Sequence, residues 1–150
     1  MKNSLFFLTI ALIILSCNQK PKKEVVEAKK TSLDGVWELV DHYSYTDNVI
    51  SDTTACMNGY RQVKIYTGGK VMWSRKVPLD STEWYGYGSY QTTDSTLTET
   101  LEYGSASMLK IIDTMRVFSF DLELGDDYYR QINTDGMGNR LFSENYRRIK

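Results

Sequence analysis

Leu33-Asp34-Gly35-Val36-Trp37-Glu38-Leu39 is the stretch of this sequence that decides its fold. Trp37 and Leu39 stand two positions apart, and side chains spaced in this way lie on the same face of a β-strand. Glu38 stands between them and belongs on the opposite, solvated face. The stretch therefore predicts a β-strand over 36–45 with Trp37 and Leu39 on its buried side.

The sequence after this strand repeats short strand-like runs that are separated by turn residues. It is rich in Tyr, Thr, Val and Phe, and hairpin connections are indicated at Gly68-Gly69, 93–95, Gly125-Asp126 and 134–139. The predicted strands are 36–45, 60–67, 70–77, 83–92, 96–103, 115–124, 127–133 and 140–149. Consecutive hairpins imply an up-and-down meander, so the predicted fold is all-β. It is an antiparallel barrel of about eight strands, with one short helix near 105–112.

Residues 33–150 are enough for one domain with a sizeable buried core. This part contains twelve Lys and Arg against seventeen Asp and Glu, a net charge of −5. Nucleic acid, which attracts basic surfaces, is therefore a poor candidate partner.

The N-terminal segment has the composition of an export signal. Lys2 supplies a short positive region, and an apolar run from Leu5 to Leu15 follows it. This run of eleven residues is short for a bilayer-spanning helix, which needs about 20 residues. A cleaved signal peptide is therefore predicted over 1–16.

Ile14-Leu15-Ser16-Cys17 resembles the lipobox that bacterial lipoprotein signal peptidase reads. The resemblance implies that Cys17 becomes the acylated first residue of the mature protein, with membrane lipid as its partner. Residues 17–32 are Lys-rich and predict a flexible tether. Asn18 after the cysteine resembles the sorting rule for outer-membrane lipoproteins, which implies a lipid-anchored envelope location. Periplasmic and surface orientations both stay open.

The opening of the first strand, Gly35-Val36-Trp37, is similar to the Gly-x-Trp signature of the lipocalin and calycin superfamily. That resemblance implies a Trp that closes the barrel base and an Arg on the last strand that packs over it. Arg148 is the candidate, because it shares a strand face with Phe142 and Tyr146. Further segments are similar to small lipocalin-like lipoproteins of Gram-negative envelopes: 85–90, 94–104, 124–126 and 144–149.

Ligand-binding candidates come from the polar residues that alternation directs toward the barrel interior. Glu99 shares a face with Leu97 and Leu101, so it needs a cationic partner, for which Arg148 and Arg130 are candidates. A structural ion pair or a Glu at the solvated mouth is the alternative reading. Further candidates for ligand contact are Tyr128, Arg130 and Tyr87, and Gly86 and Gly88 leave room beneath their strand.

Catalytic, metal and cofactor sites are not indicated. Cys56 has no neighbouring His or second thiol, and alternation places the single histidine, His42, opposite Trp37 and toward solvent. Two functions remain. One is the binding of a small apolar or amphipathic ligand inside the barrel. The other is a non-enzymatic structural or interaction role, with a packed barrel and an envelope protein as partner; a free cavity of several hundred cubic ångströms would favour the first.

Overall fold

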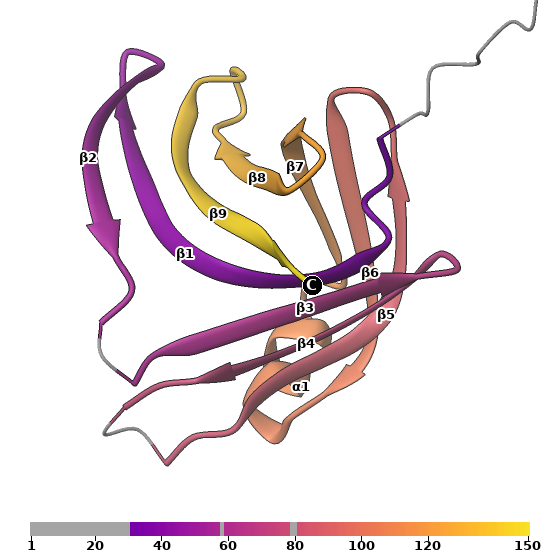
Figure 1. The fold of residues 1–150 in the computed structure, drawn as a ribbon. Coiled ribbons are helices and arrows are strands. Elements are labelled where there is room, and N and C mark those ends of the chain that lie inside the picture. The colour runs from indigo at the N-terminus through magenta and orange to yellow at the C-terminus, as the bar shows by residue number, and fades with distance from the viewer. Residues whose placement is uncertain (1–30, 58, 79–80) are drawn as a thin grey trace, which may run out of the picture.

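The computed structural model describes residues 31–57, 59–78 and 81–150. The predicted signal peptide, Cys17 and residues 17–30 of the predicted tether lie outside the described residues. The strands are β1 (Gly35–Thr46), β2 (Val49–Ala55), β3 (Arg61–Thr67), β4 (Lys70–Lys76), β5 (Trp84–Thr92), β6 (Thr96–Gly104), β7 (Val117–Leu124), β8 (Tyr128–Thr134) and β9 (Arg140–Ile149). One helix, α1 (Ala106–Ile112), separates β6 from β7 (Figure 1).

The strands form one antiparallel sheet that closes into a ring. Its order is β2-β1-β3-β4-β5-β6-β7-β8-β9, and closure comes from pairing between β1 and β9 (Figure 1). Each of the eight predicted strands is present, as is the helix. The predicted all-β barrel is therefore confirmed.

Strand β2 is the element that the sequence pattern did not indicate. All seven of its residues are exposed, so it carries no alternation between apolar and polar positions. Asp47 and Asn48 form its turn with positive φ values of 52° and 63°, a conformation that Asp and Asn tolerate. β2 pairs with β1 beyond Asp41, whereas β3 pairs with β1 between Gly35 and Glu38.

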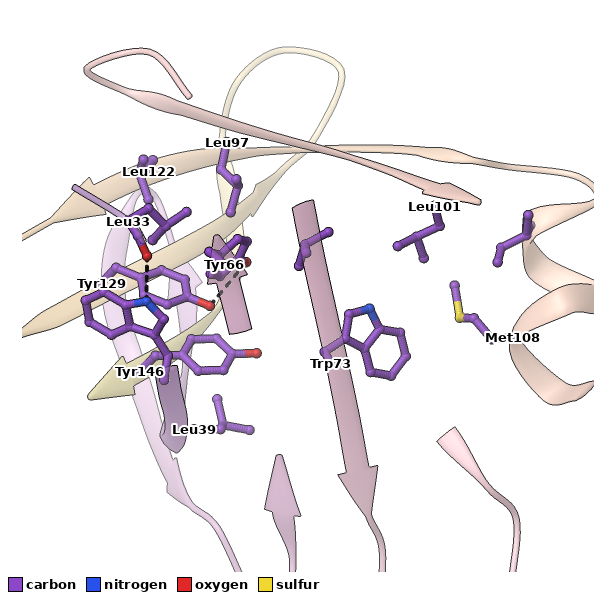
Figure 2. Close-up of a cluster of buried hydrophobic side chains, with 13 residues drawn as sticks. Leu33, Leu39, Tyr66, Trp73, Leu97, Leu101, Met108, Leu122, Tyr129 and Tyr146 are labelled. Carbon is purple, nitrogen blue, oxygen red and sulfur yellow. Dashed lines mark hydrogen bonds between the residues drawn. The ribbon is translucent and has the colours of Figure 1, made fainter. Parts of the chain in front are cut away.

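A packed aromatic core fills the end of the barrel where β1 begins. Trp37 is fully buried and meets the ring of Tyr129 edge-on at a centroid distance of 4.9 Å. Tyr129 in turn stacks on Tyr146 at 4.6 Å, and Figure 2 shows these rings beside Leu33 and Leu97. Burial of this many large side chains supplies much of the free energy that stabilises the fold.

A bulge in β6 changes which side chains face the interior. Tyr87 pairs with Tyr103, but the next residue, Gly88, pairs with Leu101, so Glu102 is an extra residue in β6. Tyr103 consequently lies outside with 53% of its surface exposed. The expected alternation holds for Leu97, Glu99 and Leu101 and stops at this bulge.

A second bulge in β1 turns His42 toward the side that alternation had excluded. Leu39 pairs with Tyr146 and Asp41 pairs with Asn145, so Val40 is the extra residue. His42 then pairs with Glu144, a residue of the barrel interior, and its ring lies 6.5 Å from that of Tyr60. The expectation that His42 faces away from the interior was therefore wrong, because unbroken alternation was assumed.

Helix α1 covers the barrel beside β5 and β6 (Figure 1). It begins after Ser105, whose side chain caps it by accepting a hydrogen bond from the Met108 backbone N–H at 3.3 Å. Met108 and Ile112 point into the core. Within the part of the chain that the structure describes, no helix has the length and hydropathy needed to cross a bilayer.

Candidate functional site

A cavity of about 220 Å³ lies inside the barrel, beyond the packed Trp37 core. Its apolar lining, called the apolar wall, is formed by Trp73, Trp84, Leu101, Met108, Ile111, Phe118, Phe120 and Phe142. Its polar lining, called the polar wall, is formed by Gln62, Lys64, Arg75, Glu99, Gln131, Asn133 and Glu144. The two sets are neighbours on adjacent strands, because Lys64 pairs with Trp73 and Glu99 pairs with Phe118. Such a concavity, mostly apolar with a few placed polar groups, is the usual form of a small-molecule site.

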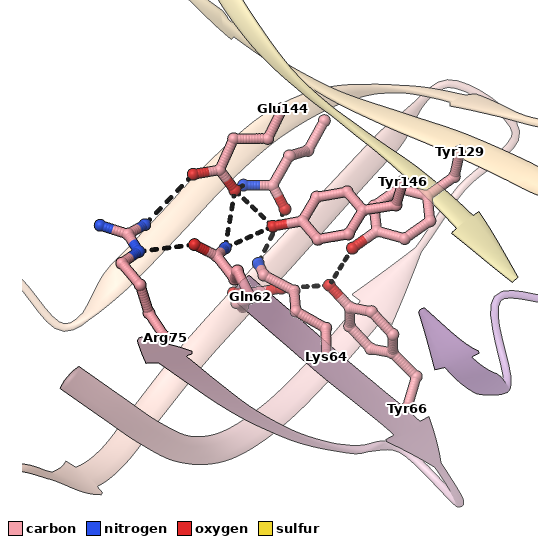
Figure 3. A network of polar contacts seen from close by, with 9 residues as sticks. Gln62, Lys64, Tyr66, Arg75, Tyr129, Glu144 and Tyr146 are labelled. Carbon is pink, nitrogen blue, oxygen red and sulfur yellow. Dashed lines mark hydrogen bonds and ion pairs between the residues drawn. The ribbon is translucent and has the colours of Figure 1, made fainter. Parts of the chain in front are cut away.

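Lys64 on β3 and Glu99 on β6 form a buried ion pair in the polar wall. Lys64 Nζ lies 2.9 Å from Glu99 Oε1, and both side chains are 4% exposed. Lys64 also donates to Gln131 Oε1 at 2.7 Å, and the Tyr66 hydroxyl donates to Glu99 Oε1 (Figure 3). The prediction of a buried, paired Glu99 therefore agrees with its position, but its partner is Lys64.

Glu144 on β9 organises the second part of the polar wall. Its Oε2 accepts hydrogen bonds from Gln62 at 3.2 Å, from Gln131 at 3.0 Å and from the Tyr146 hydroxyl at 2.5 Å. Arg75 pairs with Glu144 Oε1 at 3.3 Å, and its Nε donates to Gln62 Oε1 at 2.5 Å (Figure 3). The two cations and two carboxylates of the wall thus pair with each other and sum to zero charge.

Three buried tyrosines join this polar wall to the packed core. Burial raises the pKa of Tyr66 and Tyr146 well above the ordinary value, and the charges of Glu99 and Glu144 respectively raise it further. Burial also raises the pKa of Tyr129 well above that value. All three hydroxyls therefore stay protonated at neutral pH and act as fixed donors. Within the described residues, every buried side-chain nitrogen or oxygen has a hydrogen-bond partner.

The structure brings the predicted pair Trp37 and Arg148 together at the packed end. The Arg148 guanidinium lies over the indole, with Cζ 4.0 Å from the ring centroid. Trp37 Nε1 donates to the Leu33 carbonyl at 2.8 Å. A side chain at Gly35 would collide with the guanidinium, and its φ of 142° is one that other residues rarely adopt. Arg148 also donates to three backbone carbonyls, those of Ser32, Asp34 and Asp126.

Tyr128 and Arg130 lie on the outer face of β8, so the expectation that they contact a ligand in the interior was wrong. Their neighbours Tyr129 and Gln131 are buried, and Gln131 lines the interior cavity. Arg130 donates to Glu123 at 2.8 Å and lies over the Tyr128 ring at 5.7 Å. Tyr128 and Tyr129 are the same residue type in adjacent positions, so the sequence alone does not tell them apart. Only the strand register shows that Tyr129 faces inward.

Tyr87 is also outside, where its ring stacks on that of Tyr103 at 5.0 Å. The space expected beneath Gly86 and Gly88 is filled. The Trp73 ring packs against Gly86, and the Thr100 carbonyl approaches Gly88 so closely that any side chain there would overlap it. These glycines allow close packing of the barrel wall and leave no pocket.

The polar lining residues that sequence reasoning missed are Gln62, Lys64, Arg75, Gln131, Asn133 and Glu144. The Gly68-Gly69 turn could have shown that Lys64 faces inward. A two-residue turn pairs Thr67 with Lys70, and the same register places Lys64 opposite Trp73. With Trp73 inside, Lys64 is inside as well, although the apolar Ile65 beside it is 40% exposed.

Cys56 is half-buried and packs against the hydrophobic core. Burial raises the pKa of its thiol, and the charge of Asp41 adds to the shift. Its Sγ donates to the Leu39 carbonyl at 3.8 Å. A protonated thiol without a base is a poor nucleophile. The described residues contain no cluster of three or more His, Cys, Asp or Glu side chains arranged to hold a metal.

The closed antiparallel meander, with its Trp at the start of the first strand and its interior cavity, has the fold of a lipocalin-like barrel. Two solved structures from Bacteroides share this fold. One is a lipocalin-like protein from Bacteroides uniformis ATCC 8492, with a TM-score of 0.52 and 14% identity over 78% of this chain and 98% of that one. The other is an uncharacterized protein from Bacteroides eggerthii DSM 20697, with a TM-score of 0.52 and 17% identity over 79% of this chain and all of that one. No protein-family model and no curated protein matches the chain.

Proposed function

We propose that this chain is a lipid-anchored protein of the bacterial cell envelope whose lipocalin-like barrel binds a small amphipathic molecule. The observation that carries the proposal is the interior cavity of about 220 Å³, which is lined by both apolar and polar side chains. The apolar wall supplies affinity by removing ligand surface from water, and the polar wall fixes the ligand's orientation. Because the polar groups are already held by one another, little ordering is needed on binding.

The size of the cavity limits the ligand. Drug-sized ligands occupy sites of about 300–1,000 Å³. The cavity here is smaller, at about 220 Å³, so it suits a molecule with one ring or a short chain. Long acyl chains and extended polycyclic molecules would protrude from it.

Native mass spectrometry of the full chain, purified from its host membrane, tests this function. A copurified molecule of constant mass is expected. Met108→Trp fills the apolar wall and should abolish that mass, whereas Met72→Trp, at a half-exposed position of the outer face, should keep it. An unchanged ligand in Met108→Trp, or no ligand in any preparation, contradicts the proposal.

The membrane anchor in this proposal rests on Cys17 and the apolar run before it. Cys17→Ala should move the protein from the membrane to the soluble fraction, because two or three acyl chains would be lost. Cys56→Ala removes the other cysteine and should leave the protein in the membrane. Membrane retention of Cys17→Ala would exclude lipid anchoring at this residue.

The alternative is a non-enzymatic structural or interaction lipoprotein of the envelope. Its supporting observations are that the Trp37 end of the barrel is packed solid, with Trp37, Tyr66 and Tyr129 fully buried, and that the cavity of about 220 Å³ is smaller than the several hundred cubic ångströms that would favour ligand binding. A protein of this kind would copurify with an envelope protein and without a small molecule. The same purification therefore separates the two functions.

A further inference from the structure

We propose that the cavity selects uncharged ligands, each with a planar ring and one neutral hydrogen-bonding group, and rejects cations and anions of the same size. This inference rests on the proposed ligand-binding function and names the ligand class. It is carried by the pairing of all four charged side chains in the cavity wall.

Each charged side chain that faces the cavity is paired with another, so none is left unpaired for a ligand. Lys64 pairs with Glu99 at 2.9 Å, and Arg75 pairs with Glu144 at 3.3 Å. Three further donors, from Gln62, Gln131 and Tyr146, converge on Glu144. An ionised ligand group would either stay unpaired in the cavity or break one of these pairs, and both outcomes cost binding free energy.

Neutral hydrogen-bonding groups, by contrast, find matching partners. Asn133 lines the cavity, and its carboxamide can both donate and accept hydrogen bonds. The carboxamides of Gln62 and Gln131 also line it, but they are already bonded to Glu144 and to Arg75 or Lys64. The Asn133 side chain makes no hydrogen bond to another residue of the described chain, so its amide can serve a ligand. A ligand amide, hydroxyl or carbonyl fits this wall.

The apolar side chains of the lining favour an aromatic body. Trp73, Trp84 and Phe118 contribute rings to it, and aromatic pairs gain free energy beyond simple burial. An apolar cavity of about 150 Å³ is known to hold benzene. The cavity of about 220 Å³ therefore holds one ring with a small substituent, which is the size of benzamide.

Three molecules of nearly equal shape test the selection: benzamide is neutral, benzoate is an anion and benzamidine is a cation. Their binding to the full chain is measured by titration calorimetry and by tryptophan emission, to which Trp73 and Trp84 of the cavity contribute, with toluene as a probe that has no polar group. We expect benzamide to bind about tenfold or more tightly than either ion, which corresponds to about 1.4 kcal/mol.

The outcomes separate this inference from the function on which it rests. If toluene or benzamide binds and an ion binds equally well, charge selection fails and the ligand cavity stands. If none of the four molecules binds, both proposals fail.

Glu144→Gln provides a variant that should reverse the selection. It leaves the Arg75 guanidinium without its carboxylate, so benzoate should gain about tenfold or more relative to benzamide. Glu102→Gln is the matched control, because it removes an equivalent carboxylate from Lys70 on the outer face. An equal change in the ratio of benzoate to benzamide affinity in both variants would overturn the inference. If Glu144→Gln does not fold, the ratio of benzamide affinity to the affinity of either ion on the wild-type chain tests the inference independently.

Discussion

The two ends of the barrel interior bury side chains of opposite character. At one end Trp37, Tyr129 and Leu97 pack without space between them. At the other, Lys64 and Glu99 are just as buried, yet a cavity remains beside them. The first end uses burial to stabilise the fold. The second end maintains an open volume with charges that hold each other in place.

The boundary between the ends is a layer of three tyrosines. The rings of Tyr66, Tyr129 and Tyr146 lie with the packed core, and their hydroxyls form hydrogen bonds in the network that contains the carboxylates (Figure 3). A single strand can therefore serve both ends: β3 contributes Tyr66 to the core and, two residues earlier, Lys64 to the cavity. The same change from aromatic to charged occurs between Tyr146 and Glu144 in β9.

Trp37→Ala is expected to have the largest effect on stability. It removes a fully buried indole from the packed end and should lower the free energy of unfolding by about 3 to 5 kcal/mol in urea denaturation. Trp84→Ala is the matched change at the cavity end, where the indole is half-buried, and should cost about 1 to 2 kcal/mol. Equal losses would remove the distinction between the two ends.

Lys64→Met should cost about 3 kcal/mol, because it leaves Glu99 buried without its cation. Adding Glu99→Gln removes the unpaired charge and keeps an acceptor for Tyr66, so the double variant should recover more than half of the loss. Urea unfolding of the single and double variants measures both steps. A single-variant loss below about 1 kcal/mol would show that water reaches and solvates Glu99.

Alkaline pH should weaken the tyrosine layer. The pKa values of Tyr66, Tyr129 and Tyr146 are raised in the folded protein, so above about pH 10 the unfolded chain loses protons that the folded chain keeps. Their stabilising contribution is complete below this pH and falls as pH rises toward the folded pKa values, by up to about 1.4 kcal/mol per pH unit for each tyrosine. In urea unfolding between pH 8 and 11, Tyr66→Phe should flatten this decline. If the free energy of unfolding of Tyr66→Phe falls with pH as steeply as that of the wild type, Tyr66 does not contribute to the decline.

Tyr128→Phe should have the smallest effect, because the residue lies on the outer face of β8. Its free energy of unfolding should stay within about 0.5 kcal/mol of wild type, and benzamide affinity should not change. Calorimetry on this variant checks both values. Weakened binding would show that ligand contacts extend beyond the interior cavity.

Periodicity was enough to predict the strands that have one buried face. The pattern around Trp37 located β1, and the turn at Gly68-Gly69 separated β3 from β4. Periodicity could not reveal β2, since a strand exposed on both faces has no apolar alternation. Hairpin signals at Asp47-Asn48 were the remaining evidence for it, and they are weaker than Asn-Gly or Asp-Gly.

The candidate site was harder to predict because it depends on bulges and register. An extra residue at Glu102 or Val40 reverses the facing of everything beyond it, and nothing in those residue types indicates a bulge. Glu99 lies on the unbulged part of β6 and was placed correctly. Its partner Lys64 was missed because lysine is rarely buried unless it is paired, and the pair joins β3 to β6, which are not neighbours in the sheet.

Pairing between β1 and β9 also has a consequence for how the chain folds. It joins residues as far apart as Val36 and Ile149, 113 positions away in the sequence. Until β9 has been synthesised, Trp37 lacks Tyr146 and Arg148, and the nascent protein is an open curved sheet with an unpaired edge on β1. Non-local pairing of this kind makes folding slow, typically milliseconds to seconds, because the entropy of closing so long a loop must be lost first. Barrel closure is therefore expected to limit the rate of folding, and the partly folded chain is vulnerable to edge-to-edge association during that interval.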